Sequence, residues 1–347
     1  MNFINNIEIK NFKSIRHQKI EGCKRINIFV GPPNVGKSNI LEGLGIMSYR
    51  TNAFCNFKDL CRYDKLSKIF NDGDSQKNAE VIVNNIVYSI KYIFEDQIQF
   101  LIKENNPIFN HILENIDNRN DLISSFNINK MGVLSSWRSE IENFKNPIKV
   151  YTFRSNIRFD DKNNAKSLEI PFGQNLSLVL RHNEKVRKSC GELFSSFNLK
   201  LIFDEDDNIV IQKQLDEFTA FNISFMQMAD TLQRLIFHKT AIASNENSVL
   251  LFEEPEANMY PPYISKFTSD IINDENNNQF FIATHSPFVL NDLMENAKDD
   301  LAIYLVDYKK ETGETIINKM SDEDMHEAYQ FGYDFFLNIK QFLPQKA

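Results

Sequence analysis

The 347-residue chain has 42% hydrophobic and 25% charged residues, as globular proteins do, and its 11 glycines and 10 prolines are too few for a fibrous or low-complexity chain. At about 150 residues per domain, this length predicts two domains or one large, elaborated domain. The 39 lysines and arginines against 47 acidic residues give a net charge of -8, which argues against a protein that binds nucleic acid over its whole surface but leaves a local basic patch open.

The cysteines and the hydrophobic pattern bear on cellular location. The cysteines form no Cys-x-x-Cys pair and have no histidine at zinc-ligand spacing, so we expect reduced thiols rather than disulfides or a zinc site. The N-terminus mixes polar and apolar residues, and no later stretch approaches the ~18 uninterrupted apolar residues of a membrane span. These features predict a cytoplasmic protein without a leader or a membrane span.

The N-terminal segment predicts a strand, a glycine loop and a helix. Residues 3–10 alternate loosely between apolar and polar, and residues 26–30 form a short apolar run that stops at Gly31, as a buried strand would. Apolar residues at helical spacing follow, so we expect a helix from Lys37.

An inserted β element is expected next. Residues 80–103 alternate with period two, which predicts antiparallel strands with a turn near Asn84 or Glu95. Residues 105–147 carry short apolar clusters among Asn, Asp, Ser and Lys, so we expect short helices there and a linker near Asn146 to Pro147.

A helix is expected over residues 174–195, and it carries the densest basic cluster of the chain. Two interpretations stay open: a solvated helix face, or a contact with phosphate or nucleic acid. The cluster consists of Arg181, His182, Lys185, Arg187 and Lys188.

The C-terminal half predicts a β-α-β unit. Residues 199–212 indicate a hairpin around the acidic turn 204–207, and a helix is expected over 230–243. The compact apolar runs 248–252 and 279–283 are typical of parallel strands that are covered on both faces, and helical signal lies between them.

A phosphate-binding loop lies between the second strand and the first helix. Residues 31–38 read Gly-Pro-Pro-Asn-Val-Gly-Lys-Ser and fit G-x-x-x-x-G-K-[ST]. Such a loop turns its N–H groups and the helix N-terminus toward phosphate oxygens. Pro32 and Pro33 have no N–H, so the donors must come mainly from the rest of the loop. Lys37 would neutralise β- and γ-phosphate oxygens, and the Ser38 hydroxyl would ligate Mg²⁺.

Two acidic residues follow the apolar run 248–252 directly. The carboxyl ends of parallel strands are where open α/β sheets bind ligands. Glu253 would therefore hold Mg²⁺, and Glu254 is the candidate general base that orients the attacking water. His285 follows the next strand, in Thr-His-Ser-Pro, and would donate a hydrogen bond to the γ-phosphate or the attacking water from the same sheet edge.

Three short segments together carry a resemblance. Asn-Phe-Lys-Ser-Ile at 11–15, Phe-Glu-Glu-Pro-Glu at 252–256 and Ala-Thr-His-Ser-Pro at 283–287, in this order around the phosphate loop, resemble the ABC-type ATPases of the RecF, SMC and OLD group. The stretch from about 50 to 225 matches no motif of that group.

The resemblance implies an α/β P-loop NTPase fold, with an ABC-type head built on a mainly parallel central sheet, an antiparallel β element and a helical insertion. It implies Mg-ATP as ligand and head-to-tail pairing of two or more copies. We expect an ATPase lobe at 1–75, a β/helical subdomain at 76–170, and a helical lid that returns to the ATPase core at 171–347.

The resemblance also implies roles for single residues. Glu253 takes the metal role, Glu254 is the catalytic base, and His285 is the switch histidine. The residues expected to bind nucleotide are Lys13, Gly31, Asn34, Val35, Gly36, Lys37, Ser38 and Asn39.

Two features depart from the group's pattern. Glu253 stands where Asp is usual, so its metal contact is expected to run through water. The signature Ser-x-Gly is replaced by Met-Ala-Asp-Thr-Leu at 228–232, where Asp230 and Gln233 would cap a helix start. A carboxylate there would repel the phosphate of a partner's nucleotide unless Arg234 compensates or the pair engages nucleotide differently.

The remaining chain limits the expected function. Only 60 residues follow Pro287, without a clear acidic constellation, so no nuclease domain is expected. We expect an ATPase that acts as a nucleotide-dependent switch or scaffold for a separately encoded effector, as many small relatives in bacterial anti-phage systems do. The alternatives are a RecF-like DNA-binding repair ATPase and a scaffold that holds ATP with little turnover.

Overall fold

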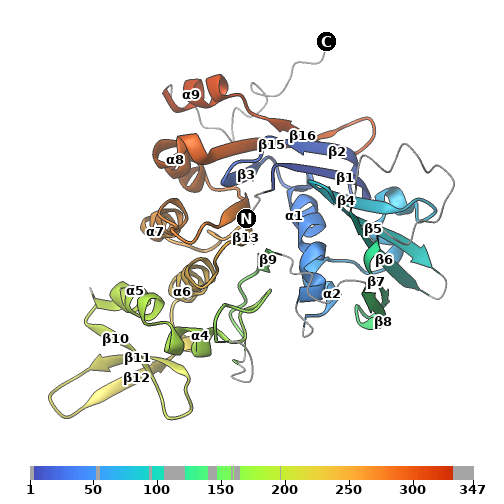
Figure 1. Cartoon of the computed structure of the whole chain (residues 1–347). Helices are drawn as coiled ribbons and strands as arrows, with labels where there is room; N and C mark the ends of the chain where they lie inside the picture. The colour runs from blue at the N-terminus through green and yellow to red at the C-terminus, as the bar shows by residue number, and fades with distance from the viewer. Residues whose placement is uncertain are drawn as a thin grey trace.

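The computed structural model describes residues 4–51, 55–93, 96–104, 122–139, 147–157, 159, 165–195 and 197–330. Its centre is a six-stranded sheet in the order β16-β15-β3-β14-β13-β9 (Figure 1). Neighbouring strands from β15 to β9 run parallel, and only β16 is antiparallel to its neighbour. The bounds are β3 (Ile26–Val30), β9 (Ile148–Tyr151), β13 (Val249–Glu253), β14 (Gln279–Ala283), β15 (Leu301–Lys309) and β16 (Glu314–Lys319).

Helices cover this sheet. Their bounds are α1 (Lys37–Gly45), α2 (Phe57–Leu60), α4 (Leu176–His182), α5 (Glu184–Ser195), α6 (Asp230–Ala243), α7 (Pro261–Ile272), α8 (Pro287–Asn296) and α9 (Asp322–Gln330). Alternate residues of the parallel strands face two different cores, because successive strand side chains point to opposite faces. Ile28 and Ile282 pack with helices α4 to α9 in one core, whereas Phe29 and Phe281 pack with α1 in the other. Burial on both faces explains why these strands are continuous apolar runs.

The second core is closed by an antiparallel sheet of seven strands, in the order β2-β1-β4-β5-β6-β7-β8. Its strands are β1 (Asn6–Phe12), β2 (Ile15–Glu21), β4 (Ala79–Val83), β5 (Ile86–Ile93), β6 (Gln97–Glu104), β7 (Leu122–Asn129) and β8 (Leu134–Ser139). The period-two prediction over 80–103 is therefore confirmed, and the chain turns at Asn84 with a positive φ of 51°. The alternative turn residue, Glu95, lies outside the described residues.

The insertion contains more β structure than we expected. Between 76 and 170, every regular element within the described residues is a strand. Of the segment 105–147, where we expected short helices, residues 105–121 and 140–146, with Asn146 of the expected linker, lie outside the described residues. The described part, 122–139, pairs as two strands instead of forming helices.

The helix expected over 174–195 is two helices. Asn183 interrupts it with extended backbone, φ -111° and ψ 95°, and its side-chain oxygen accepts a hydrogen bond from the Val186 N–H at 3.1 Å. Asn favours this local capping over a helix interior, which explains the break. The hairpin expected over 199–212 is confirmed and gains a third strand, so that the small sheet comprises β10 (Leu199–Phe203), β11 (Ile209–Gln214) and β12 (Ala220–Ser224).

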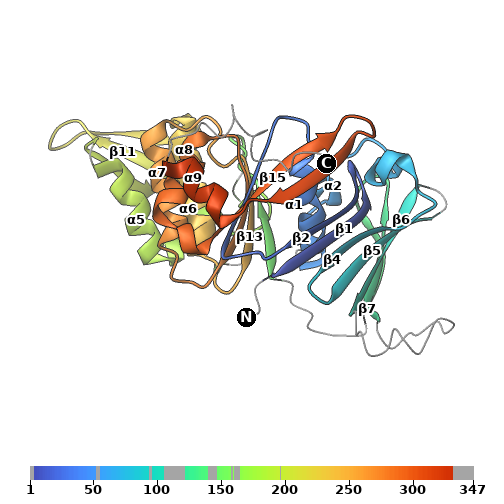
Figure 2. The same ribbon diagram turned by 90° about the horizontal axis from the view of Figure 1, so that it is seen from above.

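Seen from above, the elements form two lobes on either side of the central sheet (Figure 2). One lobe holds α5 to α9 with the small sheet, and the other holds α1, α2 and the seven-stranded sheet. The mixed α/β architecture with a mainly parallel central sheet confirms the expected fold class. The expected domain boundary between residues 75 and 76 would separate β1 and β2 from β4 to β8, although these strands belong to one sheet. The division into domains stays a prediction. Across the part of the chain that the structure describes, no helix combines the length and apolar character needed to cross a bilayer.

Candidate active site

The phosphate loop joins β3 to α1 as the motif predicts. Its backbone is left-handed at Asn34, with φ 62°, and at Gly36, with φ 103°. A Cβ atom on Gly36 would come within 2.2 Å of Thr315 Oγ1 and 2.6 Å of Ser14 Oγ, so this position requires glycine on steric as well as conformational grounds. α1 then begins at Lys37, which leaves its first N–H groups directed at the loop.

The Lys37 ammonium bridges the loop. It donates hydrogen bonds to the carbonyl oxygens of Gly31, at 3.0 Å, and Pro32, at 2.8 Å. The side chain is buried, and this burial lowers the pKa of Lys37 to about 8 although Glu254 and Glu253 favour the charged form. The ammonium is therefore the main form at pH 7, and it lacks most of the water that normally solvates it.

Two hydroxyl groups brace the loop, Thr315 from the C-terminal hairpin β15–β16 and Ser14 from the turn between β1 and β2. Thr315 Oγ1 donates to the Val35 carbonyl at 2.8 Å and lies 2.6 Å from Ser14 Oγ. Ser14 Oγ in turn accepts from Asn39 Nδ2 at 2.7 Å. Thr315 is fully buried, so segments nearly 300 residues apart in sequence fix the loop together.

Replacing Thr315 with valine keeps the shape of the side chain and removes its hydroxyl. We expect the affinity for ATP to fall roughly 3- to 10-fold, because a net hydrogen bond contributes about 0.5–1.5 kcal/mol. Titration with a fluorescent ATP analogue measures this. Thr312→Val, at an exposed position of the same hairpin, is the control and should bind like wild type. Equal affinities in all three proteins would contradict the bracing role.

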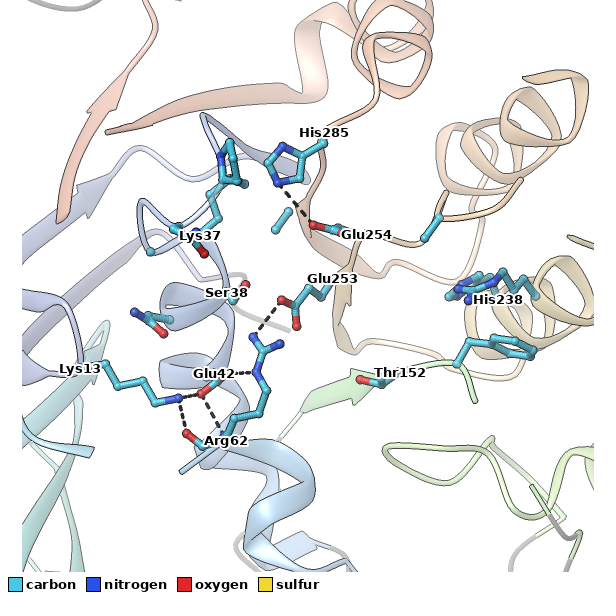
Figure 3. Close-up of a pocket in the computed structure, with 18 residues that line it drawn as sticks. Lys13, Lys37, Ser38, Glu42, Arg62, Thr152, His238, Glu253, Glu254 and His285 are labelled. Atoms are coloured by element: carbon cyan, nitrogen blue, oxygen red, sulfur yellow. Dashed lines mark hydrogen bonds and ion pairs between the residues drawn. The ribbon is translucent and has the colours of Figure 1, made fainter. Parts of the chain in front are cut away.

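The opposite wall comes from the ends of β13 and β14. Glu254 follows β13 with a left-handed φ of 43°, and its N–H still donates to the Ala283 carbonyl at 2.8 Å. This unusual backbone turns the Glu254 side chain toward His285, whose Nε2 lies 3.3 Å from Glu254 Oε1 (Figure 3). Burial, helped by the Lys37 ammonium, lowers the pKa of His285, so its imidazole is neutral at pH 7 and has one N–H to donate. Strain of this kind is found where side chains must be aimed for a function.

A charged cluster lies beside Ser38. Glu42, one helical turn further along α1, is buried and accepts from Arg62 Nε at 2.6 Å. The Lys13 ammonium also pairs with Glu42, so Lys13 is directed at this carboxylate in the structure. Arg62 Nη2 reaches across to Glu253 Oε1 at 3.0 Å.

Ser38 and Glu253 fit a divalent cation. Figure 3 shows the two side chains on facing elements, Ser38 on α1 and Glu253 at the end of β13. Hydroxyl and carboxylate oxygens are the ligands that Mg²⁺ prefers. The Arg62 side chain is 65% exposed, so its ion pair with Glu253 contributes little stability and yields readily to a cation.

The walls enclose a cavity of about 660 Å³. Most of the residues predicted from sequence line it together: Lys13, Asn34, Gly36, Lys37, Ser38, Asn39, Glu253, Glu254 and His285. Gly31 and Val35 do not line it. They support the loop through their carbonyl groups, which accept from Lys37 and Thr315.

Residues 26–291 match the protein family described as "AAA domain, putative AbiEii toxin, Type IV TA system". The match runs from β3 into α8 and covers well over half of the chain. The chain belongs to this AAA-domain family. The match confirms the resemblance to ABC-type ATPases that the motifs indicated.

Curated relatives match shorter segments of this AAA-domain protein. One segment of 119 residues, 30% of the chain, is 29% identical to an "ATP/GTP phosphatase" of Helicobacter pylori and covers 30% of it. Another of 46 residues, 13% of the chain, is 41% identical to the DNA replication and repair protein RecF of Thermoanaerobacter and covers 13% of it. The chain thus spans less than a third of the length of these two relatives. Among solved structures, an Smc head bound to the C-winged helix domain of ScpA is similar over 94% of this chain and 100% of that one, with 15% identity and a TM-score of 0.49.

The start of α6, where the AAA-domain protein departs from the signature, differs from the capping prediction. Ala229 is the N-cap residue, and the Asp230 carboxylate accepts from Arg234 Nε at 2.6 Å instead of capping the helix. Gln233 Nε2 reaches back to the Met228 carbonyl at 2.8 Å. The capping prediction was wrong because a charged partner one turn away competes for the carboxylate. Arg234 therefore compensates the charge of Asp230 within the same chain.

Further along α6, Arg234 and His238 line the cavity, together with Phe153 from the segment after β9. The Arg234 guanidinium lies 4.7 Å from the centre of the Phe153 ring. His238, one turn on, is 2% exposed, and burial together with Arg234 lowers its pKa to about 3. His238 is therefore neutral, and Arg234 supplies the charge on this wall.

Several residues that line the cavity of the AAA-domain protein were not predicted from the sequence. Glu42 had a local signal, since it lies four residues after Ser38 and so on the same helix face. His238 had the same kind of signal, since it lies four residues after Arg234 on α6, whereas Arg62 and Thr152 reach the cavity only through tertiary packing.

The basic cluster on α4 and α5 is largely neutralised. Arg181 pairs with Asp207, Lys188 lies 2.7 Å from Glu184, and Lys185 lies 3.5 Å from Glu275. These pairs favour the solvated-face interpretation over a nucleic-acid contact, because the carboxylates reduce the positive potential that phosphates would meet.

Proposed function

We propose that this protein binds Mg-ATP in the cavity between α1 and the ends of β13 and β14, and hydrolyses it there. The observation that carries the proposal is that Lys37, Glu254 and His285, from three separate segments, line one cavity. Their chemistry is complementary: a desolvated cation for phosphate, a carboxylate for a water proton, and a neutral imidazole with an N–H to donate.

Each residue has a distinct proposed role. Lys37 and the N–H groups of the loop hold the β- and γ-phosphates. Ser38 and Glu253 hold Mg²⁺, which when bound neutralises developing charge on the phosphate oxygens. Glu254 accepts a proton from the attacking water, and its contact with His285 aligns the two side chains. When nucleotide is bound, His285 gives up this contact and donates its one ring N–H to the γ-phosphate instead.

We further propose that ATP turnover controls a separately encoded effector. The described elements are those of an ATPase head, and the family description names a toxin of a toxin–antitoxin system, which supports a role in bacterial defence. Pairing of two copies follows from the family resemblance. An effector that is controlled in this way would co-purify with the protein differently with and without ATP.

Chelation of Mg²⁺ tests the proposed reaction. We expect phosphate release from ATP with Mg²⁺, and a loss of at least ~10-fold in rate with excess EDTA, because the metal neutralises developing phosphate charge. A malachite-green or coupled phosphate assay measures both rates. Restored turnover on adding Mg²⁺ beyond the chelator is the control for irreversible damage. Binding of ATP without hydrolysis in the presence of Mg²⁺ would favour the scaffold with little turnover instead.

A further inference from the structure

Glu256 carries a buried carboxyl group two residues after the proposed base Glu254, and the proposed reaction assigns it no role. It lies in the turn after β13, where the Ala257 N–H donates to the Glu254 carbonyl at 3.0 Å. The turn directs the Glu256 side chain under the end of β14. There Glu256 Oε1 accepts from Thr284 Oγ1 at 2.5 Å and from the His285 N–H at 3.2 Å.

The hydrogen bonds around Thr284 have a defined direction. Thr284 is fully buried, and its Oγ1 accepts from the Ser286 N–H at 2.9 Å. The single hydroxyl proton of Thr284 is then free to be donated to Glu256. Glu256 Oε1 thus holds the backbone N–H of His285 itself. The Thr284 hydroxyl, which Oε1 orients, holds the backbone N–H of the next residue, Ser286.

We propose that Glu256 is the positioning residue for His285. The same turn presents Glu254 to the ring nitrogen of His285 and Glu256 to its backbone N–H, so it holds this histidine at both ends. Glu256 thereby sets the direction of the imidazole relative to the base. This role rests on the proposed ATP hydrolysis, in which His285 acts.

The second oxygen of Glu256 supports this interpretation. Oε2 is buried and has no hydrogen-bond partner among the described residues, and the residue as a whole is 8% exposed. Such burial raises the pKa of Glu256. An imperfectly satisfied carboxyl group costs stability, and deviations of this kind are expected where a side chain serves a function rather than the fold.

A double-mutant cycle tests the role. Glu256→Leu removes the acceptor, and we expect ATP turnover to fall ~10- to 100-fold with ATP affinity unchanged, because misplacement of a reacting group by about 1 Å can cost ~100-fold in rate. Glu256→Gln keeps one acceptor oxygen and should recover turnover to within about threefold. In a His285→Ala background, Glu256→Leu should cause no further loss. Additive losses, or a Glu256→Leu enzyme with wild-type turnover, would overturn the proposal. The exposed Glu246→Leu is the matched control.

A second readout does not depend on turnover. The ring resonance of His285, assigned with His285→Ala among the six histidines of the chain, should move in Glu256→Leu and stay in place in Glu256→Gln. If wild-type protein does not hydrolyse ATP, the proposed function fails, and this resonance alone decides whether Glu256 orients the ring. If Glu256→Leu does not fold, Thr284→Val replaces it in the cycle and the spectrum, since it removes the bridging hydroxyl and keeps the shape. An unmoved resonance in the variant used refutes the role.

Discussion

Replacing Glu254 with glutamine is expected to lower the rate of ATP hydrolysis roughly 10²- to 10⁴-fold, the usual contribution of a general base. The amide has nearly the same shape, but it cannot accept the proton of the attacking water. The Glu254 side chain is half exposed, and a glutamine amide can still contact the His285 ring, so the substitution should leave the fold intact. ATP affinity should stay within about threefold of wild type, because the phosphates are held by the loop and not by this carboxylate.

Steady-state phosphate release and a single-turnover experiment measure this effect. The two together separate slow chemistry from slow product release, which look alike at steady state. Glu246→Gln, in the exposed loop before β13, is the matched control and should turn over ATP like wild type. If Glu254→Gln hydrolysed ATP at the wild-type rate, the proton of the attacking water would leave by another route, and Glu254 would not be the general base.

The parts of the fold that the sequence predicted well are those buried on two faces. The strands 26–30 and 279–283 and the helix 230–243 have the bounds we expected, because burial forces continuous apolar runs and helical spacing. The sheet-edge residues Glu253 and His285 could be found for the same reason: polar side chains that directly follow buried strands must lie at one edge.

What the sequence did not predict depends on contacts between distant segments. Thr315 braces a loop that lies 280 residues earlier, and nothing in its own hairpin indicates this contact. Arg62 reaches Glu253 from a loop without regular pattern. The break at Asn183 also escaped detection, because apolar periodicity continues through it while a single side-chain hydrogen bond decides the backbone.

Replacing Lys37 with methionine is expected to weaken ATP binding roughly 10- to 150-fold, since a hydrogen bond to a charged group contributes about 1.5–3 kcal/mol. Methionine has a similar length and no charge, so the loop keeps its packing and loses the cation that faces the phosphates. Equilibrium titration with ATP measures the affinity. The exposed Lys65→Met controls for the loss of one positive charge and should bind like wild type.

The same substitution has a second expected effect, of opposite sign. Burial lowers the pKa of Lys37 to about 8 from the usual 10.5, so the folded state disfavours the ammonium. Between these two pH values the unfolded chain binds a proton that the folded chain does not, and by linkage the stability of wild type rises with pH across this window. Lys37→Met should therefore melt no lower than wild type at pH 7, and any gain should shrink above pH 8. Weaker ATP binding with unchanged or higher melting temperature would identify Lys37 as a cation kept for its ligand. Loss of both would show that its hydrogen bonds to the loop carbonyls serve the fold instead.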